Sequence, residues 1–479
     1  MQKTLTTKHT NYTKRGNMKS PKIVVIGAGS YFFARPVIWN MVNSRILREG
    51  TLALVDTKPH VLETMMKLGR KAIAATKAPV KLVGSTDRRE MLKDADFVVL
   101  TFSDKNAYYR GVDCRISEKY GVRMCSGDTI GPGGIFRALR EVPRAIEMSK
   151  DIAKLAPEAW TINFVNPTSV MGIALMRYAP QIRSFAICDG LHEPYHRVRM
   201  LKHVGILPED ATSIPPEIER SLEYHVQGVN HFTWLAKFAY KGKDFLPVWR
   251  EKLKEMVKNE VDDNVHNANA KAKAKFNAAY SLLLMDIFGA YPNCMAHTKE
   301  YVPYFQGYGV NEPYPEKLMV FDAQGRDLEM KARWKENEEF ASGKRSIKEF
   351  LTKGKGDHAT DIIESMWGGL RKKFYINSAN RGAVPNMAND AFIELLCDLD
   401  MNGPRPLPAS PMPRGLLGLQ QQVLDTHELT AEAAVTCDRG ILMRAMMTDP
   451  IINNIEDGRK IMKELLDEER DILPKKWYK

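Results

Sequence analysis

The sequence predicts an α/β protein with a Rossmann-like, doubly wound and mostly parallel sheet and a second α+β domain. Three observations support this fold class. Short apolar runs alternate with amphipathic stretches long enough to be crossover helices, up to about residue 195. The first apolar run ends in a glycine turn that leads directly into a helical stretch. Beyond residue 195 this alternation weakens, and strand-rich and helix-rich segments follow in separate blocks.

The individual elements follow from hydrophobic periodicity. Strands are expected at 22–26, 52–55, 80–83, 97–102, 161–165 and 185–188, and helices at 31–42 and 59–77. In the second part, residues 224–239 are strand-rich, whereas 248–287 and 416–447 have helical patterns. The charged segment 327–355 resembles a solvated insertion. No internal repeat or low-complexity linker separates the two parts, so we expect them to pack directly together.

Length and charge suggest how the chain is divided. Its 479 residues exceed what one hydrophobic core usually organises. We expect a disordered basic extension at 1–20, a first domain at 21–195 and a second domain at 196–479. Part of the net charge of +12 lies in the extension and at the C-terminus, and no basic stripe interleaved with aromatic residues occurs elsewhere. Nucleic-acid binding is therefore not expected.

The cysteines and the apolar segments indicate the compartment. The six cysteines form no CxxC pair and have no regular spacing, so neither a disulfide framework nor a zinc ribbon is predicted. The first residues lack the apolar segment of a signal peptide, and no run of about 18 apolar residues could span a membrane. These features predict a soluble, cytoplasmic protein without a membrane partner.

The first candidate site is the glycine turn Gly27-Ala28-Gly29-Ser30, which lies between an expected strand and an expected helix. Glycines allow a tight turn there, so that the helix amides can hold a pyrophosphate. Asp56 ends the next strand, where a carboxylate would bind an adenosine ribose and favour NAD over NADP. A structural turn with a surface aspartate is the alternative interpretation.

Further polar residues are expected at the carboxyl ends of strands, where such sheets bind ligands. The loop 128–134 contains three glycines and either approaches a ligand or is an ordinary helix entry. Asn166, before Pro167, either presents its amide at this edge or forms a turn. Cys188 and Asp189 could bind a transition metal or transfer protons. The alternative interpretation is a buried structural cysteine next to a surface acid.

The second part adds two candidates. His231 lies within an apolar, strand-like stretch, where a histidine is more often a satisfied core group than a ligand. His297, Glu300 and Tyr301 have the spacing i, i+3, i+4, which on a helix aims all three at one region. Their dense aromatic surroundings favour a core, but the titratable side chains are also compatible with a site.

Taken in order, these motifs resemble glycoside hydrolase family 4, the NAD- and divalent-metal-dependent glycosidases. The resemblance extends from about residue 22 to about residue 450. Its elements are Gly-Ala-Gly-Ser at 27–30, Gly-Pro-Gly-Gly with Ala-Leu-Arg at 131–140, Asn-Pro at 166, Cys-Asp at 188, Val-Asn-His at 229–231, Glu-Tyr-Val-Pro-Tyr-Phe at 300–305, and the segment 380–386, which resembles the family's Asn-x-Gly-x-Ile.

The resemblance implies a role for each candidate. Cys188 and His231 would hold the metal, typically manganese or another divalent transition metal. Asp189 would be the general acid, with Tyr301 the first choice and His297 the second choice for the base. The residues expected to bind NAD are Gly27, Gly29, Ser30, Asp56 and Asn166. Those expected to bind the substrate are Asn166, Asn230 and Arg381.

The resemblance also implies the reaction. NAD-dependent glycosidases are an exception to hydrolysis by two carboxylates. Cleavage would proceed by transient oxidation at carbon 3 of the sugar, metal-assisted deprotonation at carbon 2, elimination, addition of water and re-reduction. An α-glucoside, α-galactoside or α-glucuronide is the expected substrate, and β- or 6-phospho-glycosides are the alternative within the family. A sugar dehydrogenase and a non-catalytic sugar or NAD sensor are the rival classes. A homodimer or homotetramer is expected.

Overall fold

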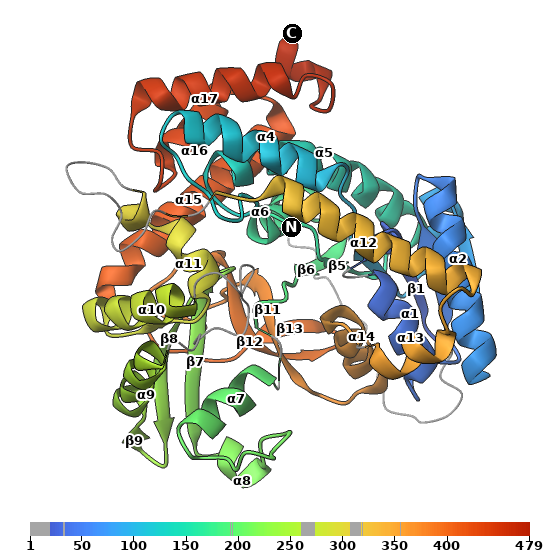
Figure 1. The fold of residues 1–479 in the computed structure, drawn as a ribbon, viewed down its shortest axis with the longest axis horizontal. Coiled ribbons are helices and arrows are strands. Elements are labelled where there is room, and N and C mark those ends of the chain that lie inside the picture. Colours follow the sequence, from blue (N-terminus) through green and yellow to red (C-terminus); the bar gives the residue numbers. More distant parts are fainter. Residues whose placement is uncertain are drawn as a thin grey trace, which may run out of the picture.

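The computed structural model describes residues 20–31, 34–191, 193, 195–259, 274–306, 318, 320–354 and 356–479 (Figure 1). Residues 1–19 of the expected basic extension lie outside this part of the chain. Within it, no helix is long and apolar enough to cross a membrane.

One mixed sheet of 13 strands runs through the described residues. Its first half is parallel: β1 (Lys22–Ile26), β2 (Thr51–Val55), β3 (Lys81–Ser85), β4 (Phe97–Leu100), β5 (Trp160–Asn163) and β6 (Arg183–Ala186). The helices between them are α1 (Ala34–Asn43), α2 (Pro59–Thr76), α3 (Arg88–Leu92), α4 (Asn106–Lys119), α5 (Gly131–Leu155) and α6 (Thr168–Tyr178). Strand β4, Phe-Val-Val-Leu, is buried throughout, as expected for a parallel strand covered on both faces. The predicted fold class is confirmed.

The second half of the chain extends the same sheet with antiparallel strands. These are β7 (Leu222–Val229), β8 (Phe232–Tyr240), β9 (Lys243–Asp244), β10 (Tyr291–Pro292), β11 (Lys373–Ala379), β12 (Phe392–Asp400) and β13 (Gly403–Pro406). The junction is β11 against β6, with Asn377 opposite Ala186. Figure 1 shows this part of the sheet continuing away from α1 and α2. Hydrophobic periodicity does not indicate β11, β12 or β13.

Helices cover both halves of the sheet. The later ones are α7 (Tyr195–His203), α8 (Pro216–Glu219), α9 (Leu246–Lys258), α10 (Ala274–Phe288), α11 (Met295–Tyr301), α12 (Ala323–Ser342), α13 (Ile347–Lys353), α14 (His358–Gly368), α15 (Arg414–Thr436), α16 (Arg439–Thr448) and α17 (Ile455–Glu468), with 3-10 turns η1 (Pro303–Phe305) and η2 (Lys475–Tyr478). Helix α15 packs on α5, α6 and α16, so the C-terminal helices close over the first half of the chain.

The charged segment 327–355 is not a solvated insertion, as the sequence pattern suggested. It forms most of α12 and all of α13, which pack against α2, and α12 also contacts α4. Phe340 and Phe350 are almost fully buried there, and Arg35 of α1 forms an ion pair with Glu336 at 2.5 Å. The prediction failed because these few apolar residues are widely spaced among charges, so that no continuous stripe marks the buried face.

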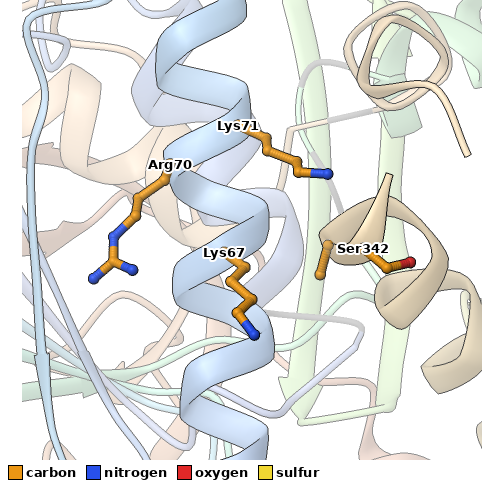
Figure 2. A pocket seen from close by; sticks show the side chains of 5 residues that line it. Lys67, Arg70, Lys71 and Ser342 are labelled. Carbon is orange, nitrogen blue, oxygen red and sulfur yellow. The ribbon is translucent and has the colours of Figure 1, made fainter. Parts of the chain in front are cut away.

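A surface pocket of about 430 Å³ lies between α2 and the end of α12 (Figure 2). It is lined by Lys67, Arg70 and Lys71 of α2 and by Ala341 and Ser342. Lys71 extends towards Ser342, whereas Arg70 points away from it. Cations near the carboxyl end of a helix interact favourably with its dipole. Lys71 is therefore explained by the docking of α12 on α2, whereas Lys67 forms an ion pair with Glu63 of α2 at 2.7 Å.

Candidate active site

The glycine turn after β1 is tightly packed. Gly27 has a φ of +98°, and a Cβ atom there would lie 2.6 Å from the backbone nitrogen of Phe102. The amides of Gly27 and Ala28 both donate to the carbonyl of Val55 at 2.9 Å. Only glycine is compatible with this position. The turn therefore stays close to the ends of β2 and β4.

Asp56 lies directly beside this turn. Its Oδ2 accepts a hydrogen bond from the amide of Gly29 at 2.8 Å, and its Oδ1 accepts one from the amide of Lys58 at 3.0 Å. The amide of Ser30 donates to the carbonyl of Gly27 at 3.0 Å. The structure thus brings Gly27, Gly29, Ser30 and Asp56 together, with a half-buried carboxylate at the place where a dinucleotide fold binds a ribose.

Cys188 and His231 meet just beyond the end of β6. The Sγ atom of Cys188 lies 2.9 Å from Nε2 of His231, and Oδ1 of Asp189 lies 3.7 Å from the same sulfur. Cys188 and His231 are buried, whereas Asp189 is exposed. Burial, reinforced by the negative charge of Asp189, raises the pKa of the Cys188 thiol well above its usual value. A bound cation would oppose this shift, because a metal-coordinated thiol is deprotonated.

The donor set fits a divalent transition metal. One ligand atom from each of Cys188, Asp189 and His231 lies within 4.8 Å of the others. Thiolate and imidazole donors suit transition metals, and a carboxylate also suits manganese. The structure therefore brings the two expected metal ligands and the expected general acid into one cluster.

His231 does not lie inside a strand, as the apolar stretch suggested, but in the turn between β7 and β8. Val229 and Phe232 are paired across this hairpin, so Asn230 and His231 form its two-residue loop. His231 has a φ of +60°, a left-handed conformation that usually requires glycine, asparagine or aspartate. An observed backbone outlier of this kind at a cluster of polar groups is typical of a functional position.

A buried carboxyl supports this turn. Glu394 of β12 is 1% exposed and lies opposite Gly228 of β7. Burial raises the pKa of Glu394 to about 7, although the charge of His231 and a hydrogen bond from its backbone amide act in the opposite direction. Glu394 therefore holds the backbone of the turn that carries the imidazole.

Helix α11 places His297 and Glu300 against this cluster. The ring of His297 stacks on that of His231, with centroids 4.2 Å apart and an interplanar angle of 15°. Its Nδ1 lies 3.8 Å from Oε2 of Glu300. Burial raises the pKa of Glu300, but His297 and the backbone of Ser126 lower it, and the pKa ends below its usual value. The Glu300 carboxylate therefore lies at ion-pair distance from the imidazole of His297.

Tyr301 belongs to the same helix but is held differently. Its hydroxyl donates to the backbone carbonyl of Asn230 at 2.8 Å, and its ring stacks on Phe232 with centroids 5.1 Å apart. The side chain is 1% exposed, and burial raises its pKa well above the usual value. Tyr301 and Asn230 are thus part of the cluster, with the tyrosine hydroxyl bound to the hairpin.

The residues just before the glycine-rich loop 128–134 also reach this region, and Gly131 to Gly134 form the first turn of α5. The backbone amide of Gly127 donates to Glu300 at 3.2 Å, and that of Ser126 donates to the same carboxylate. Asp128 forms an ion pair with Arg137 at 3.0 Å. Burial raises the pKa of Asp128, but the two arginines beside it outweigh this effect and hold the pKa well below its usual value. The loop therefore joins the start of α5 to α11.

Asn166 and Arg381 have different positions. Asn166 follows β5 at the same edge of the sheet as Cys188, and its Oδ1 accepts a hydrogen bond from Thr168 at 2.5 Å. Arg381 follows β11, which runs antiparallel to β6, so it lies towards the opposite edge. Its Nη1 is 3.4 Å from the carbonyl of Pro404. The structure does not bring Arg381 together with the other candidates.

Two residues of this region, Cys294 and Glu394, received no role from the sequence. Cys294 lies 3.6 Å from Nδ1 of His231, and its spacing of Cys-x-x-His with His297 was the available signal. Glu394 is a single acid inside the apolar run Phe-Ile-Glu-Leu-Leu, which is a weak signal. Only strand pairing shows that it lies beside the hairpin.

The comparisons with known proteins define the class. The model described as "Family 4 glycosyl hydrolase" matches residues 22–202, and that of its C-terminal domain matches residues 226–452. The chain therefore belongs to the family 4 glycosyl hydrolases, and the predicted family and enzyme class are confirmed. A sugar dehydrogenase is not favoured.

Individual relatives are more distant. The alpha-galacturonidase of Lachnoclostridium phytofermentans is 26% identical, covering 96% of this chain and 98% of the relative. The alpha-galactosidase of Bacillus subtilis is also 26% identical, covering 90% and 93%. A 6-phospho-alpha-glucosidase from gut microorganisms, solved in complex with NAD and Mn2+, has a TM-score of 0.74 at 22% identity, covering 95% and 99%. That structure supports the fold.

Proposed function

We propose that this chain hydrolyses an α-galactoside or α-galacturonide with NAD and a divalent metal, preferably Mn2+. The observation that carries the proposal is the Cys188–Asp189–His231 cluster, which lies at the same sheet edge as the glycine turn and Asp56. The galactose configuration is supported by the two curated relatives, an alpha-galacturonidase and an alpha-galactosidase. The fold relative that was solved with NAD and Mn2+ supports the cofactors.

Each group of residues has a defined task in this proposal. The glycine turn and Asp56 would bind and orient the dinucleotide, with Asn166 contributing its amide from the end of β5. Cys188 and His231 would hold the metal, and Asn230 would contact the sugar. When bound, the cofactors supply reversible hydride transfer at carbon 3 and polarisation of the resulting carbonyl. Asp189, exposed beside Cys188, protonates the departing glycosidic oxygen.

We place His297 ahead of Tyr301 as the base that removes the carbon 2 proton. A general base works best when a third group orients it, and Glu300 lies 3.8 Å from Nδ1 of His297. The Tyr301 hydroxyl already donates to the Asn230 carbonyl, and burial strongly disfavours its anion. This order reverses the one that the family resemblance suggests.

The proposed reaction is tested by following solvent deuterium into the sugar product. Aryl α- and β-galactosides, galacturonides and 6-phospho-glycosides are incubated in deuterated buffer with and without NAD and Mn2+. We expect hydrolysis of the α-galactosyl compounds that depends on both additives and places deuterium at carbon 2. Activity without either additive, or product without label, would contradict the mechanism. Accumulation of NADH in proportion to substrate would favour the dehydrogenase instead.

The choice of base leads to a second prediction. His297→Ala is expected to lower kcat by about 100-fold to 10,000-fold, the usual contribution of a general base, and to abolish deuterium incorporation at carbon 2. Tyr301→Phe keeps the stacked ring and should retain turnover within about tenfold. Both variants are assayed at saturating Mn2+, with NAD affinity as the check on folding. If Tyr301→Phe alone loses the exchange, tyrosine is the base.

The setting of the enzyme is also part of the proposal. All six cysteines are free thiols, five of them buried, which suits a reducing cytoplasm. We further propose a homodimer or homotetramer, which light scattering of the purified chain would test.

A further inference from the structure

The imidazole of His231 lies between two sulfur atoms. Its Nε2 is 2.9 Å from Sγ of Cys188, and its Nδ1 is 3.6 Å from Sγ of Cys294. Cys294 is 2% exposed and is the residue immediately before α11. The proposed function uses the first sulfur but gives no role to the second.

We propose that Cys294 is a positioning residue that selects the metal-binding form of His231. A neutral imidazole carries one proton, and the nitrogen that binds a metal must be the unprotonated one. If the sulfur of Cys294 accepts a hydrogen bond from Nδ1–H, the lone pair of Nε2 is left for the ion beside Cys188. This inference rests on the proposed metal site and deepens it.

The position of Cys294 is fixed independently of any ligand. The preceding strand β10 pairs with β8, and the amide of Asn293 donates to the carbonyl of Thr233 at 2.9 Å. The carbonyl of Cys294 in turn accepts from the amide of Thr298 at 2.8 Å. His231 directly precedes β8, and Cys294 follows β10, which pairs with β8. The pairing of these two strands therefore fixes the positions of the sulfur and the imidazole relative to each other.

The geometry argues against a second metal site formed by Cys294, His231 and His297. Cys294, His231 and His297 also form a group of donors within 4.8 Å. However, the two imidazole rings are stacked nearly parallel, at 15°. Imidazole lone pairs lie in the ring plane, so two stacked rings cannot direct them at one ion. The acceptor role is therefore favoured over a second metal site.

Metal titration of the full-length, metal-free protein tests the inference. Loss of an outer partner of a metal-binding histidine typically lowers metal affinity by about 10-fold to 100-fold. We expect Cys294→Ala to weaken Mn2+ binding by this factor, while NAD affinity stays at the wild-type value. Cys294→Ser, whose hydroxyl can also accept the Nδ1 hydrogen, should bind Mn2+ more tightly than Cys294→Ala. Equal weakening in both variants would overturn the acceptor role.

The matched control is Cys397→Ala, which removes a fully buried sulfur from β12 outside the donor groups. Its Mn2+ affinity should match the wild type, and a similar loss of affinity in Cys397→Ala would show that Cys294→Ala acts only through packing.

Saturation with Co2+ gives a second readout, because thiolate coordination produces a charge-transfer absorption. We expect full intensity in Cys294→Ala, whereas half the wild-type intensity would make Cys294 a ligand. An unchanged absorption in Cys188→Ser would instead remove the proposed metal site itself.

Discussion

Replacing Cys188 by serine is expected to reduce kcat/KM for the preferred glycoside by at least about 1,000-fold, which corresponds to about 4 kcal/mol of lost transition-state stabilisation. In the proposed function, the thiolate would supply both a ligand and a negative charge to the metal, beside His231 at 2.9 Å. A serine hydroxyl is a poor ligand for a divalent transition metal and stays protonated. The measurement is a steady-state assay across a range of Mn2+ concentrations, combined with a Mn2+ binding curve.

Two controls isolate the metal effect. Cys437→Ser changes a half-buried thiol at the end of α15 and should leave kcat/KM within about twofold, as expected of a substitution away from special features. NAD binding to Cys188→Ser should also be unchanged, because Gly27, Gly29 and Asp56 belong to other strand ends. If Cys188→Ser keeps more than a tenth of wild-type activity at limiting Mn2+, Cys188 is not a metal ligand.

The parallel half of the fold was predictable because its strands are nearly continuous apolar runs. Six such runs with amphipathic stretches between them leave few alternatives, and the carboxyl ends of parallel strands share one edge. Placing Gly27, Asp56, Asn166 and Cys188 at one edge therefore followed from the sequence alone. The antiparallel strands were less visible, since β11 and β12 are interrupted by polar residues such as Asn377 and Glu394.

The rest of the site depends on strand order and direction, which the sequence pattern does not determine. His231 was assigned through the family resemblance, but its left-handed turn follows from the pairing of Val229 with Phe232. Arg381 was expected near the substrate and lies towards the other edge because β11 is antiparallel to β6. In the same way, only the neighbouring positions of β12 and β7 bring Glu394 beside the hairpin.

Arg140 belongs to the Ala-Leu-Arg motif of the family resemblance, yet the structure gives it a structural task. It lies in α5, with Nη2 at 2.8 Å from Asp113 of α4 and Nη1 at 2.5 Å from Glu469, which follows α17. The side chains of all three residues are at most 3% exposed. One guanidinium thus joins three segments that are far apart in the chain. Burial and the charge of Asp113 raise the pKa of Glu469 well above its usual value, although Arg140 lowers it.

Arg140→Met is expected to destabilise the protein by about 3 to 5 kcal/mol, because removing one partner of a buried ion pair leaves uncompensated charge. The loss should increase with pH. Without Arg140, the pKa of Glu469 in the folded protein rises further. The stability that protonated Glu469 contributes is therefore fully present below the pKa of an unfolded glutamate, and it is lost as the pH rises through the pKa of Glu469 in the folded protein. Urea denaturation at pH 5 and pH 8 measures both effects.

The control is Arg115→Met, which removes an exposed ion pair with Glu468 at 4.0 Å and should cost less than about 1 kcal/mol at either pH. Equal losses in the two variants would mean that the buried cluster contributes no more than a surface pair.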